Sequence, residues 1–104
     1  MQTDWVATRP RRFFYPSNYI CLGWALPAAL GAAVGLPDSP VVSLSGDGGF
    51  LMTAQELASA VRYKLRLIAI VHNDSAYGAM KHIQHRFYQD RFHEIGRASC
   101  RERV

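Results

Sequence analysis

The chain has 104 residues and a formal net charge of +4, and 49% of its residues are hydrophobic. This length allows one small domain at most, and this hydrophobic fraction excludes a disordered chain. The longest strictly apolar stretch, Leu67 to Val71, is far shorter than the roughly 20 residues of a membrane span, and the first residues lack the order of a signal peptide, so a cytoplasmic localisation is expected.

Residues 1–19 contain prolines, clustered arginines and several aromatic rings without clear periodicity, and are predicted as an extended lead-in. Within them, RPRRFFY at residues 9–15 mixes basic and aromatic side chains, as single-strand nucleic-acid-binding proteins do. The cluster holds only three arginines. We therefore favour a surface or inter-domain linker and expect no nucleic-acid partner.

Residues 22–40, LGWALPAALGAAVGLPDSP, are rich in small side chains and predict a helix. Pro27 suits the first turn of this helix, and Gly35 followed by Pro37 indicates its end. The small side chains would let the helix approach a sheet closely. Cys21, just before it, is expected to be a small buried hydrophobic residue.

Two short hydrophobic runs predict strands. VVSLS at residues 41–45 is rich in β-branched side chains, and LIAIV at residues 67–71 is continuously apolar, as expected of a strand buried on both faces. Between them, Thr53 and Glu56 have the spacing of a capping box, which predicts the start of a helix. Residues 79–90 are predicted as another helix. The order of elements predicts an α/β fold with a parallel sheet, flanking helices and right-handed crossovers.

Residues 95–104, IGRASCRERV, match the translation of a widely used sequencing adapter. We interpret them as translated adapter sequence, a scar that is not part of the natural protein, and exclude them from the fold prediction. The alternative is a genuine basic tail. Without them the net charge is +2 and Cys21 is the single cysteine. A single cysteine cannot form an internal disulfide, which agrees with a reducing compartment.

Polar turns follow both predicted strands, GDGG at residues 46–49 and HNDSAYG at residues 72–78. In a parallel sheet both turns lie at the carboxyl edge, where ligands bind. The glycines permit a turn and expose N–H groups to phosphate, yet Asp47 would repel a phosphate. Mg²⁺ removes this conflict because it takes about six oxygens and bridges carboxylates to phosphates. The sequence therefore predicts Mg²⁺ between Asp47 and the loop that offers Asn73 and Asp74.

These motifs resemble the thiamine diphosphate signature of acetolactate synthases and benzoylformate decarboxylase-like enzymes. GDG is followed by a paired Asn loop, with Asp74 lying 27 residues after Asp47. CLGWALPAALGA at residues 21–32 is similar to the family segment (M/L/I)G(F/Y)ALPAAIGA, and NDSAYG is similar to NNxxYG. On this resemblance, residues 20–94 are interpreted as part of the pyrophosphate-binding domain, with an incomplete parallel sheet.

The resemblance also implies a role for each matching residue. Asp47, Asp74 and the carbonyl of Ala76 would bind Mg²⁺. The remaining cofactor-binding residues would be Gly46, Gly48, Gly49, Tyr77 and Gly78 along the diphosphate, Leu22 as the apolar support of the bent cofactor, and Ile20, whose backbone would face the aminopyrimidine. The chain departs from the commoner pattern twice: Asp74 stands where Asn is frequent, adding a negative charge, and Ile20 where Gly is frequent.

The resemblance implies chemistry on a 2-oxo acid, in which the thiazolium carbon of thiamine diphosphate adds to the substrate and CO₂ leaves. Acetolactate synthase-like carboligation is the first interpretation, and a 2-oxo acid decarboxylase the second. The Glu that this chemistry requires lies on a pyrimidine-binding domain, usually from a neighbouring subunit, which implies a homo-oligomer at full length. That domain is not recognisable here, and Glu56 belongs to the capping box. We therefore expect an inactive fragment without a catalytic residue of its own.

Other interpretations remain open. Asp47 could be a left-handed turn residue. His82 and His85, spaced i, i+3, could bind a metal, although a solvated face is favoured, and His72 could reach substrate or pack at the strand end. For the whole chain, the alternatives are a Rossmann-like nucleotide-binding module, although GDGGFL lacks the G-x-G-x-x-G pattern, and a non-functional gene fragment. A sheet that lacks strands would expose apolar surface, so poor solubility is expected.

Overall fold

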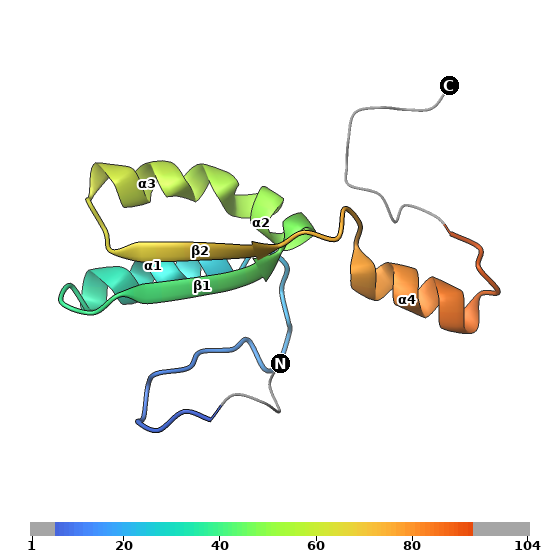
Figure 1. The fold of residues 1–104 in the computed structure, drawn as a ribbon, viewed down its shortest axis with the longest axis horizontal. Helices are drawn as coiled ribbons and strands as arrows, with labels where there is room; N and C mark the ends of the chain where they lie inside the picture. The colour runs from blue at the N-terminus through green and yellow to red at the C-terminus, as the bar shows by residue number, and fades with distance from the viewer. Residues whose placement is uncertain (1–5, 93–104) are drawn as a thin grey trace.

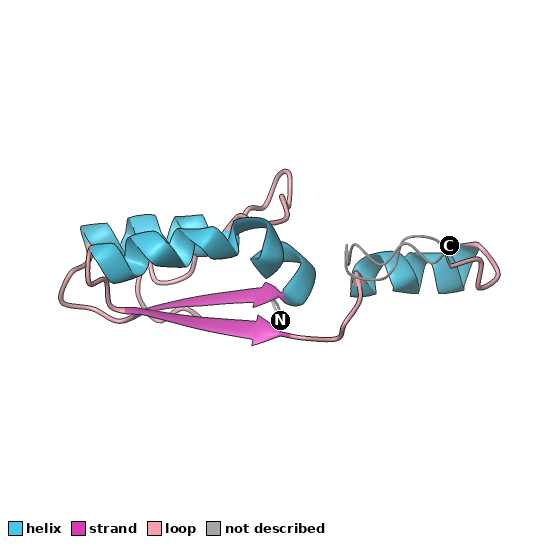
Figure 2. Cartoon of the chain, turned by 90° about the horizontal axis from the view of Figure 1, so that it is seen from above, coloured by secondary structure: helices cyan, strands magenta, loops and turns pink. Residues whose placement is uncertain are grey.

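A small parallel sheet with two helical segments on one side forms the body of the molecule (Figures 1 and 2). The computed structural model describes residues 6–92, so the predicted scar at 95–104 lies outside the described residues. Residues 6–24 contain no helix or strand. The elements in chain order are α1 (Ala25–Gly35), β1 (Val41–Gly46), α2 (Asp47–Thr53), the 3₁₀ helix η1 (Ala54–Glu56), α3 (Leu57–Arg62), β2 (Leu67–His72) and α4 (Gly78–Phe87).

The buried core lies chiefly along α1. Its buried residues recur at helical spacing and form one stripe: Leu26, Ala29, Leu30 and Ala33. This stripe packs against the sheet, where Ser43 of β1 is also buried. Three of these side chains are methyl or hydroxymethyl groups, so helix and sheet approach closely. The helix begins two residues before Pro27 and ends at Gly35, as the sequence predicts.

The two strands pair in parallel, from Val41 opposite Leu67 to Gly46 opposite His72. The predicted α/β class with a parallel sheet and flanking helices is therefore confirmed. Because the strands run in the same direction, both of their carboxyl ends lie at one edge of the sheet. The turns that follow Gly46 and His72 start from neighbouring positions (Figure 1).

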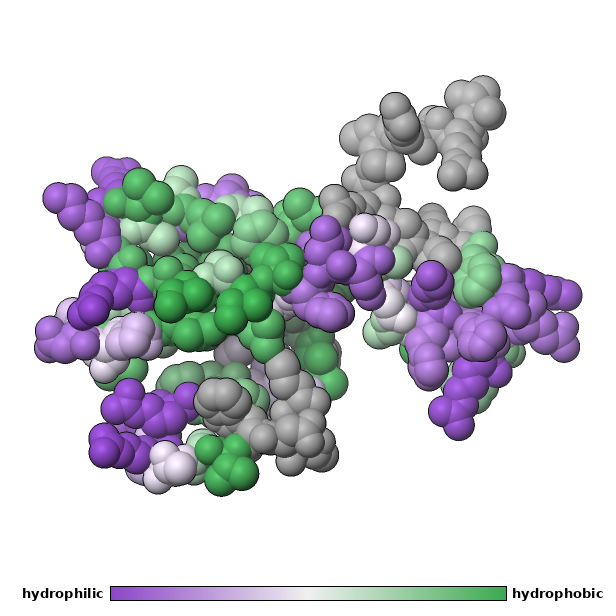
Figure 3. Space-filling model, in the orientation of Figure 1, coloured by the Kyte–Doolittle hydropathy of each residue, from purple (hydrophilic) through white to green (hydrophobic). Residues whose placement is uncertain are grey.

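One face of the sheet is open, which corrects the prediction that residues 67–71 are buried on both faces. Register pairs Val42 with Ile68 and Leu44 with Ile70, and these four side chains are between 40% and 54% exposed. Side chains alternate across a strand, and helices α1 and α3 lie on the other side of the sheet (Figure 2). Figure 3 shows hydrophobic residues gathered over the strands in the view of Figure 1.

The segment between the strands is three short helical pieces rather than one helix that starts at a capping box. Thr53 makes no side-chain cap on η1. Instead, its Oγ1 donates a hydrogen bond to the carbonyl oxygen of Gly23, 3.2 Å away. The capping-box prediction is therefore wrong, because the Thr53 hydroxyl is hydrogen-bonded to a carbonyl distant in sequence instead of to the helix that follows.

The remaining helix, α4, stands apart from the sheet and is joined to it through the loop after β2 (Figures 1 and 2). None of the described helices is long and apolar enough to cross a membrane.

Cys21 is exposed rather than buried, because it lies in the bend before α1, where the Trp24 N–H donates to the Cys21 carbonyl.

Candidate functional site

The GDG turn is a direct passage from strand to helix. β1 ends at Gly46, and α2 begins at Asp47, with Gly48 as its second residue. Among the described glycines only Gly23 has a positive φ, so Gly46, Gly48 and Gly49 are not required for an unusual backbone conformation. Asp47 is also helical, which overturns its interpretation as a left-handed turn residue.

Gly48 is needed for space. A Cβ atom placed on Gly48 would lie 2.5 Å from Cε1 and 2.8 Å from Cδ1 of Tyr77. Carbon atoms in ordinary contact are about 3.5–4.0 Å apart, so no side chain fits there while the ring is in place. The ring of Tyr77 therefore lies directly against the backbone of the GDG turn. The two turns, far apart in sequence, are in contact.

The loop after β2 is shaped by two side chains that accept hydrogen bonds from the backbone two residues on. The Ser75 N–H donates to Oδ1 of Asn73 at 3.1 Å, and the Ala76 N–H donates to Oδ1 of Asp74 at 3.2 Å. Such Asx turns are the usual local alternative to regular structure for these residues. The other carboxylate oxygen of Asp74 occupies the space that a Cβ on Gly78 would need. The loop thus holds the Asp74 carboxylate beside Ala76 and Gly78.

A third segment, residues 20–24, lies against the same turn. A Cβ on Gly49 would be 3.5 Å from the backbone nitrogen of Gly23 and 3.9 Å from Cδ2 of Leu22. Leu22 is 60% exposed, and its side chain reaches Gly49 from outside the core. Ile20 is also exposed and has a φ of 48°, so the chain bends sharply just before this contact.

Thr53 is the residue of this region whose role the sequence reasoning missed. Its hydroxyl holds the Gly23 carbonyl, and its Cγ2 lies 3.1 Å from the position of a Cβ on Gly23. The φ of 81° at Gly23 in turn permits this approach. The capping-box spacing drew attention to Thr53 but indicated the wrong partner, and no local signal identifies a carbonyl 30 residues away.

The chemistry of the donors suits a hard cation. Asp47 is 6% exposed at the first position of α2, while Asp74 lies on the exposed loop. Among residues 6–92, no three His, Cys, Asp or Glu side chains cluster as metal ligands. The predicted set instead combines these two carboxylates with the Ala76 carbonyl, all oxygen donors, as Mg²⁺ prefers. Within the GDG turn, a Cβ on Gly46 would meet nothing within 4 Å, so the backbone is accessible there. These residues fit a magnesium diphosphate group.

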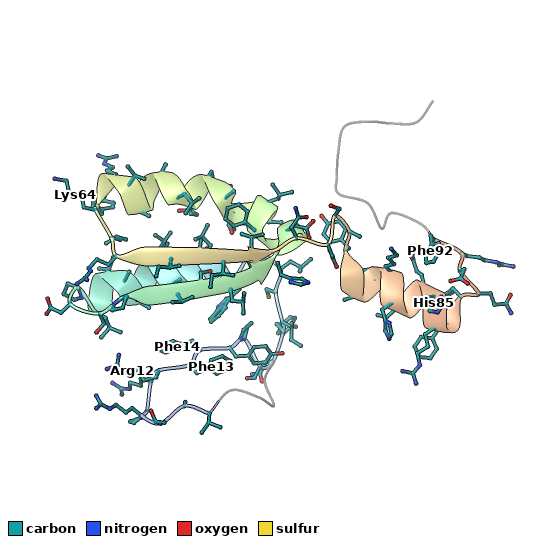
Figure 4. The ribbon with its side chains drawn as sticks, in the orientation of Figure 1. Arg12, Phe13, Phe14, Lys64, His85 and Phe92 are labelled. Carbon is teal, nitrogen blue, oxygen red and sulfur yellow. The ribbon has the colours of Figure 1, made fainter. Side chains whose placement is uncertain are left out.

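The histidines are distributed differently. His72 ends β2 opposite Gly46, at the edge that carries the two turns. His82 and His85 lie on α4, away from that edge, and Figure 4 shows His85 at the far end of the helix. The Nδ1 atom of His85 contacts the Asp90 carboxylate. The structure does not bring the α4 histidines to the predicted site.

Comparison with known proteins identifies the family. The sequence model described as "Thiamine pyrophosphate enzyme, C-terminal TPP binding domain" matches residues 1–101. The chain belongs to this family. The resemblance read from GDG, NDSAYG and the ALPAALGA segment is thereby confirmed. The match extends beyond residues 20–94, and the domain boundaries proposed at 19 and 94 stay predictions.

Curated relatives of this thiamine pyrophosphate enzyme chain carry several activities in their names. It is 39% identical over 87 residues to the acetolactate synthase isozyme 2 large subunit of Escherichia coli K12, covering 84% of this chain and 16% of the relative. It is 39% identical over 83 residues to a sulfoacetaldehyde acetyltransferase of Alcaligenes xylosoxydans, covering 80% and 14%. It is 44% identical over 73 residues to a probable 2-ketoarginine decarboxylase of Pseudomonas aeruginosa, covering 69% and 13%. The chain thus spans about a sixth of the length of the first relative.

Proposed function

We propose that this chain binds the magnesium diphosphate end of thiamine diphosphate, within an enzyme that acts on 2-oxo acids as acetolactate synthase does. The observation that carries the proposal is the contact between Gly48 and Tyr77, together with the pairing of Gly46 with His72. These place the GDG turn and the NDSAYG loop at one edge of the sheet. Membership of the thiamine pyrophosphate enzyme family supports the choice of cofactor.

Asp47, Asp74 and the Ala76 carbonyl are the proposed ligands of Mg²⁺. A diphosphate beside two carboxylates is repelled, and a divalent cation between them reverses the sign of that interaction. The Asx turn at Asp74 leaves its carboxylate fixed to the loop rather than free to rotate. Oriented in advance, it loses less conformational entropy when it binds a cation.

The rest of the cofactor would extend from the GDG turn towards residues 20–24. Gly46, where a Cβ would meet nothing within 4 Å, leaves room for the diphosphate, which Gly48, Gly49, Tyr77 and Gly78 would line. Leu22, exposed next to Gly49, offers an apolar support, and the bend at Ile20 presents backbone. When bound, thiamine diphosphate would supply a nucleophilic carbon and an electron sink for chemistry on a 2-oxo acid.

We further propose that activity needs a pyrimidine-binding domain carrying a Glu, from another part of a homo-oligomeric protein. The chain covers only 16% of the acetolactate synthase relative, which leaves most of that protein unaccounted for. By itself the chain is expected to turn over no pyruvate with Mg²⁺ and thiamine diphosphate. Turnover by the isolated chain would overturn this part of the proposal.

Calorimetric titration with thiamine diphosphate tests the proposal. Binding is expected with Mg²⁺ and is expected to vanish with a chelator. Asp47→Asn should weaken Mg²⁺-dependent binding by at least about tenfold. Loss of a residue that only hydrogen-bonds to a metal ligand already has an effect of that size, and Asp47 is proposed as a ligand itself. Asp38→Asn is the matched control, because Asp38 is an exposed carboxylate before β1, at the opposite end of the strand.

Two results would contradict the proposal. Equal binding by the Asp47→Asn and Asp38→Asn variants would exclude the metal site at the GDG turn. Binding of NAD in place of thiamine diphosphate would favour a Rossmann-like nucleotide-binding module instead.

A further inference from the structure

We propose that Tyr77 is a positioning residue: its ring, seated on the backbone of Gly48, holds the two metal-binding turns together, and its hydroxyl is not required. This inference rests on the proposed function, since it concerns the same magnesium site. It assigns Tyr77 a steric role between the turns in place of a polar role towards the diphosphate.

The contact lies next to the proposed donors on both sides. Gly48 directly follows Asp47, and Tyr77 directly follows Ala76 and lies three residues after Asp74. Gly48 is buried, and Tyr77 is partly buried just before α4. A shift of the ring therefore moves the backbone that carries Ala76 relative to the backbone that carries Asp47.

The two Asx turns of the loop act within the loop. The Asx turns at Asn73 and Asp74 join those residues to Ser75 and Ala76 of the same loop. They set the shape of the loop but do not set its distance from the GDG turn. The Tyr77 ring reaches across from one turn to the other. Since Mg²⁺ demands near-ideal octahedral geometry, a small change in that distance affects affinity.

The atoms in contact are ring carbons. Those nearest to a Cβ on Gly48 are Cε1, Cδ1 and Cζ of Tyr77, at 2.5, 2.8 and 3.4 Å. A flat aromatic ring fills the space over a glycine without a hydrogen bond. Phenylalanine has the same ring, so the role is expected to survive loss of the hydroxyl. Alanine at 77 would leave the two turns without this contact.

A double-mutant cycle tests the inference in the chain, with the dissociation constant of Mg²⁺ at saturating thiamine diphosphate as the first readout. Tyr77→Phe is expected to stay within about twofold of the parent. Tyr77→Ala and Gly48→Ala are each expected to weaken Mg²⁺ binding by about tenfold or more, the effect typical of partners that orient metal ligands. The double variant should be no weaker than either single variant, because Gly48→Ala displaces the ring that Tyr77→Ala removes, so both changes act on the same contact.

The second readout is the thermal midpoint without Mg²⁺, which reports folding independently of the cofactor. Tyr63→Ala is the matched control, because Tyr63 is an exposed tyrosine at the end of α3, and its loss should leave Mg²⁺ affinity unchanged. If Tyr77→Ala does not unfold cooperatively, Tyr77→Leu replaces it in the cycle. Leucine keeps apolar bulk without a flat ring, so it should still weaken Mg²⁺ binding.

The outcomes separate the two proposals. If the parent chain binds no thiamine diphosphate with Mg²⁺, the proposed function fails. If the parent binds but Tyr77→Phe loses as much affinity as Tyr77→Ala, the hydroxyl acts on the ligand and the positioning role is wrong. If the Tyr77 and Gly48 effects add fully, the contact does not link the turns, and the inference is also overturned.

Discussion

The hydroxyl of Thr53 donates a hydrogen bond to the carbonyl oxygen of Gly23, which is 3.2 Å away in space and 30 residues away in sequence. This bond joins the end of α2 to the bend before α1. The first turn of the same helix carries Asp47 and Gly48. The bond therefore links the helix that carries the GDG turn to residues 20–24, and it stabilises their arrangement beside that turn.

Thr53→Val is expected to lower the free energy of unfolding by about 1 kcal/mol. Valine keeps the shape of threonine but leaves the partly buried Gly23 carbonyl without its donor, and a lost hydrogen bond of this kind has about that effect. Thr53→Ser keeps the donor and should lie closer to the parent. Urea unfolding followed by circular dichroism measures both, and equal stability of the valine variant and the parent would exclude this anchor.

Gly23→Ala is expected to destabilise the chain by about 1–2 kcal/mol, because the φ of 81° at Gly23 suits glycine. The new methyl group would also lie 3.1 Å from Cγ2 of Thr53 and 3.2 Å from Cβ of Met52. Gly31→Ala is the matched control. A Cβ on Gly31 meets nothing within 4 Å and lies inside α1, so alanine there should stabilise by about 0.5–1 kcal/mol. Thermal unfolding should give shifts of opposite sign, and shifts of the same sign would contradict this explanation.

Asp74→Asn is expected to make thiamine diphosphate binding less dependent on Mg²⁺. The amide oxygen can still accept the hydrogen bond from the Ala76 N–H, so the Asx turn should persist. One negative charge beside the diphosphate is removed, which reduces the repulsion that Mg²⁺ must offset. Titration with chelator present should detect weak residual binding in the variant that the parent lacks. Greater dependence on Mg²⁺ in the variant would contradict the role assigned to Asp74.

Replacing the exposed aliphatic residues of the sheet is expected to reduce self-association. Ile68→Thr combined with Ile70→Thr keeps β-branched side chains on β2 while making the open face polar. Sedimentation velocity should then show more monomer at equal concentration. Leu30→Thr, which places a hydroxyl at a buried position of α1, is the control and should unfold the chain rather than make it more soluble. Unchanged association of the double variant would show that another surface is responsible.

Much of the fold follows from local pattern. The bounds of α1 agree with the positions of Pro27 and Gly35, and both strands agree with their apolar runs to within one residue. The hydrogen bonds of a helix join residues four apart, and the apolar run of a strand is contained in the strand itself, so composition and periodicity suffice to locate these elements. The capping-box prediction failed because it also used local pattern alone: the spacing of Thr53 and Glu56 carries no information about Gly23.

The sequence by itself determined that two polar turns follow two parallel strands, and the parallel order of such strands requires both turns to lie at one edge. That edge, the GDG and NDSAYG motifs and the family were therefore within reach of the sequence. Only the tertiary structure decided that Gly48 gives space to the Tyr77 ring, that Thr53 holds Gly23, and that one face of β2 stays open. A glycine required for a turn and a glycine required for close packing look alike in sequence. Only the atoms that the fold brings against the glycine from distant parts of the chain, as it brings the Tyr77 ring against Gly48, distinguish the two cases.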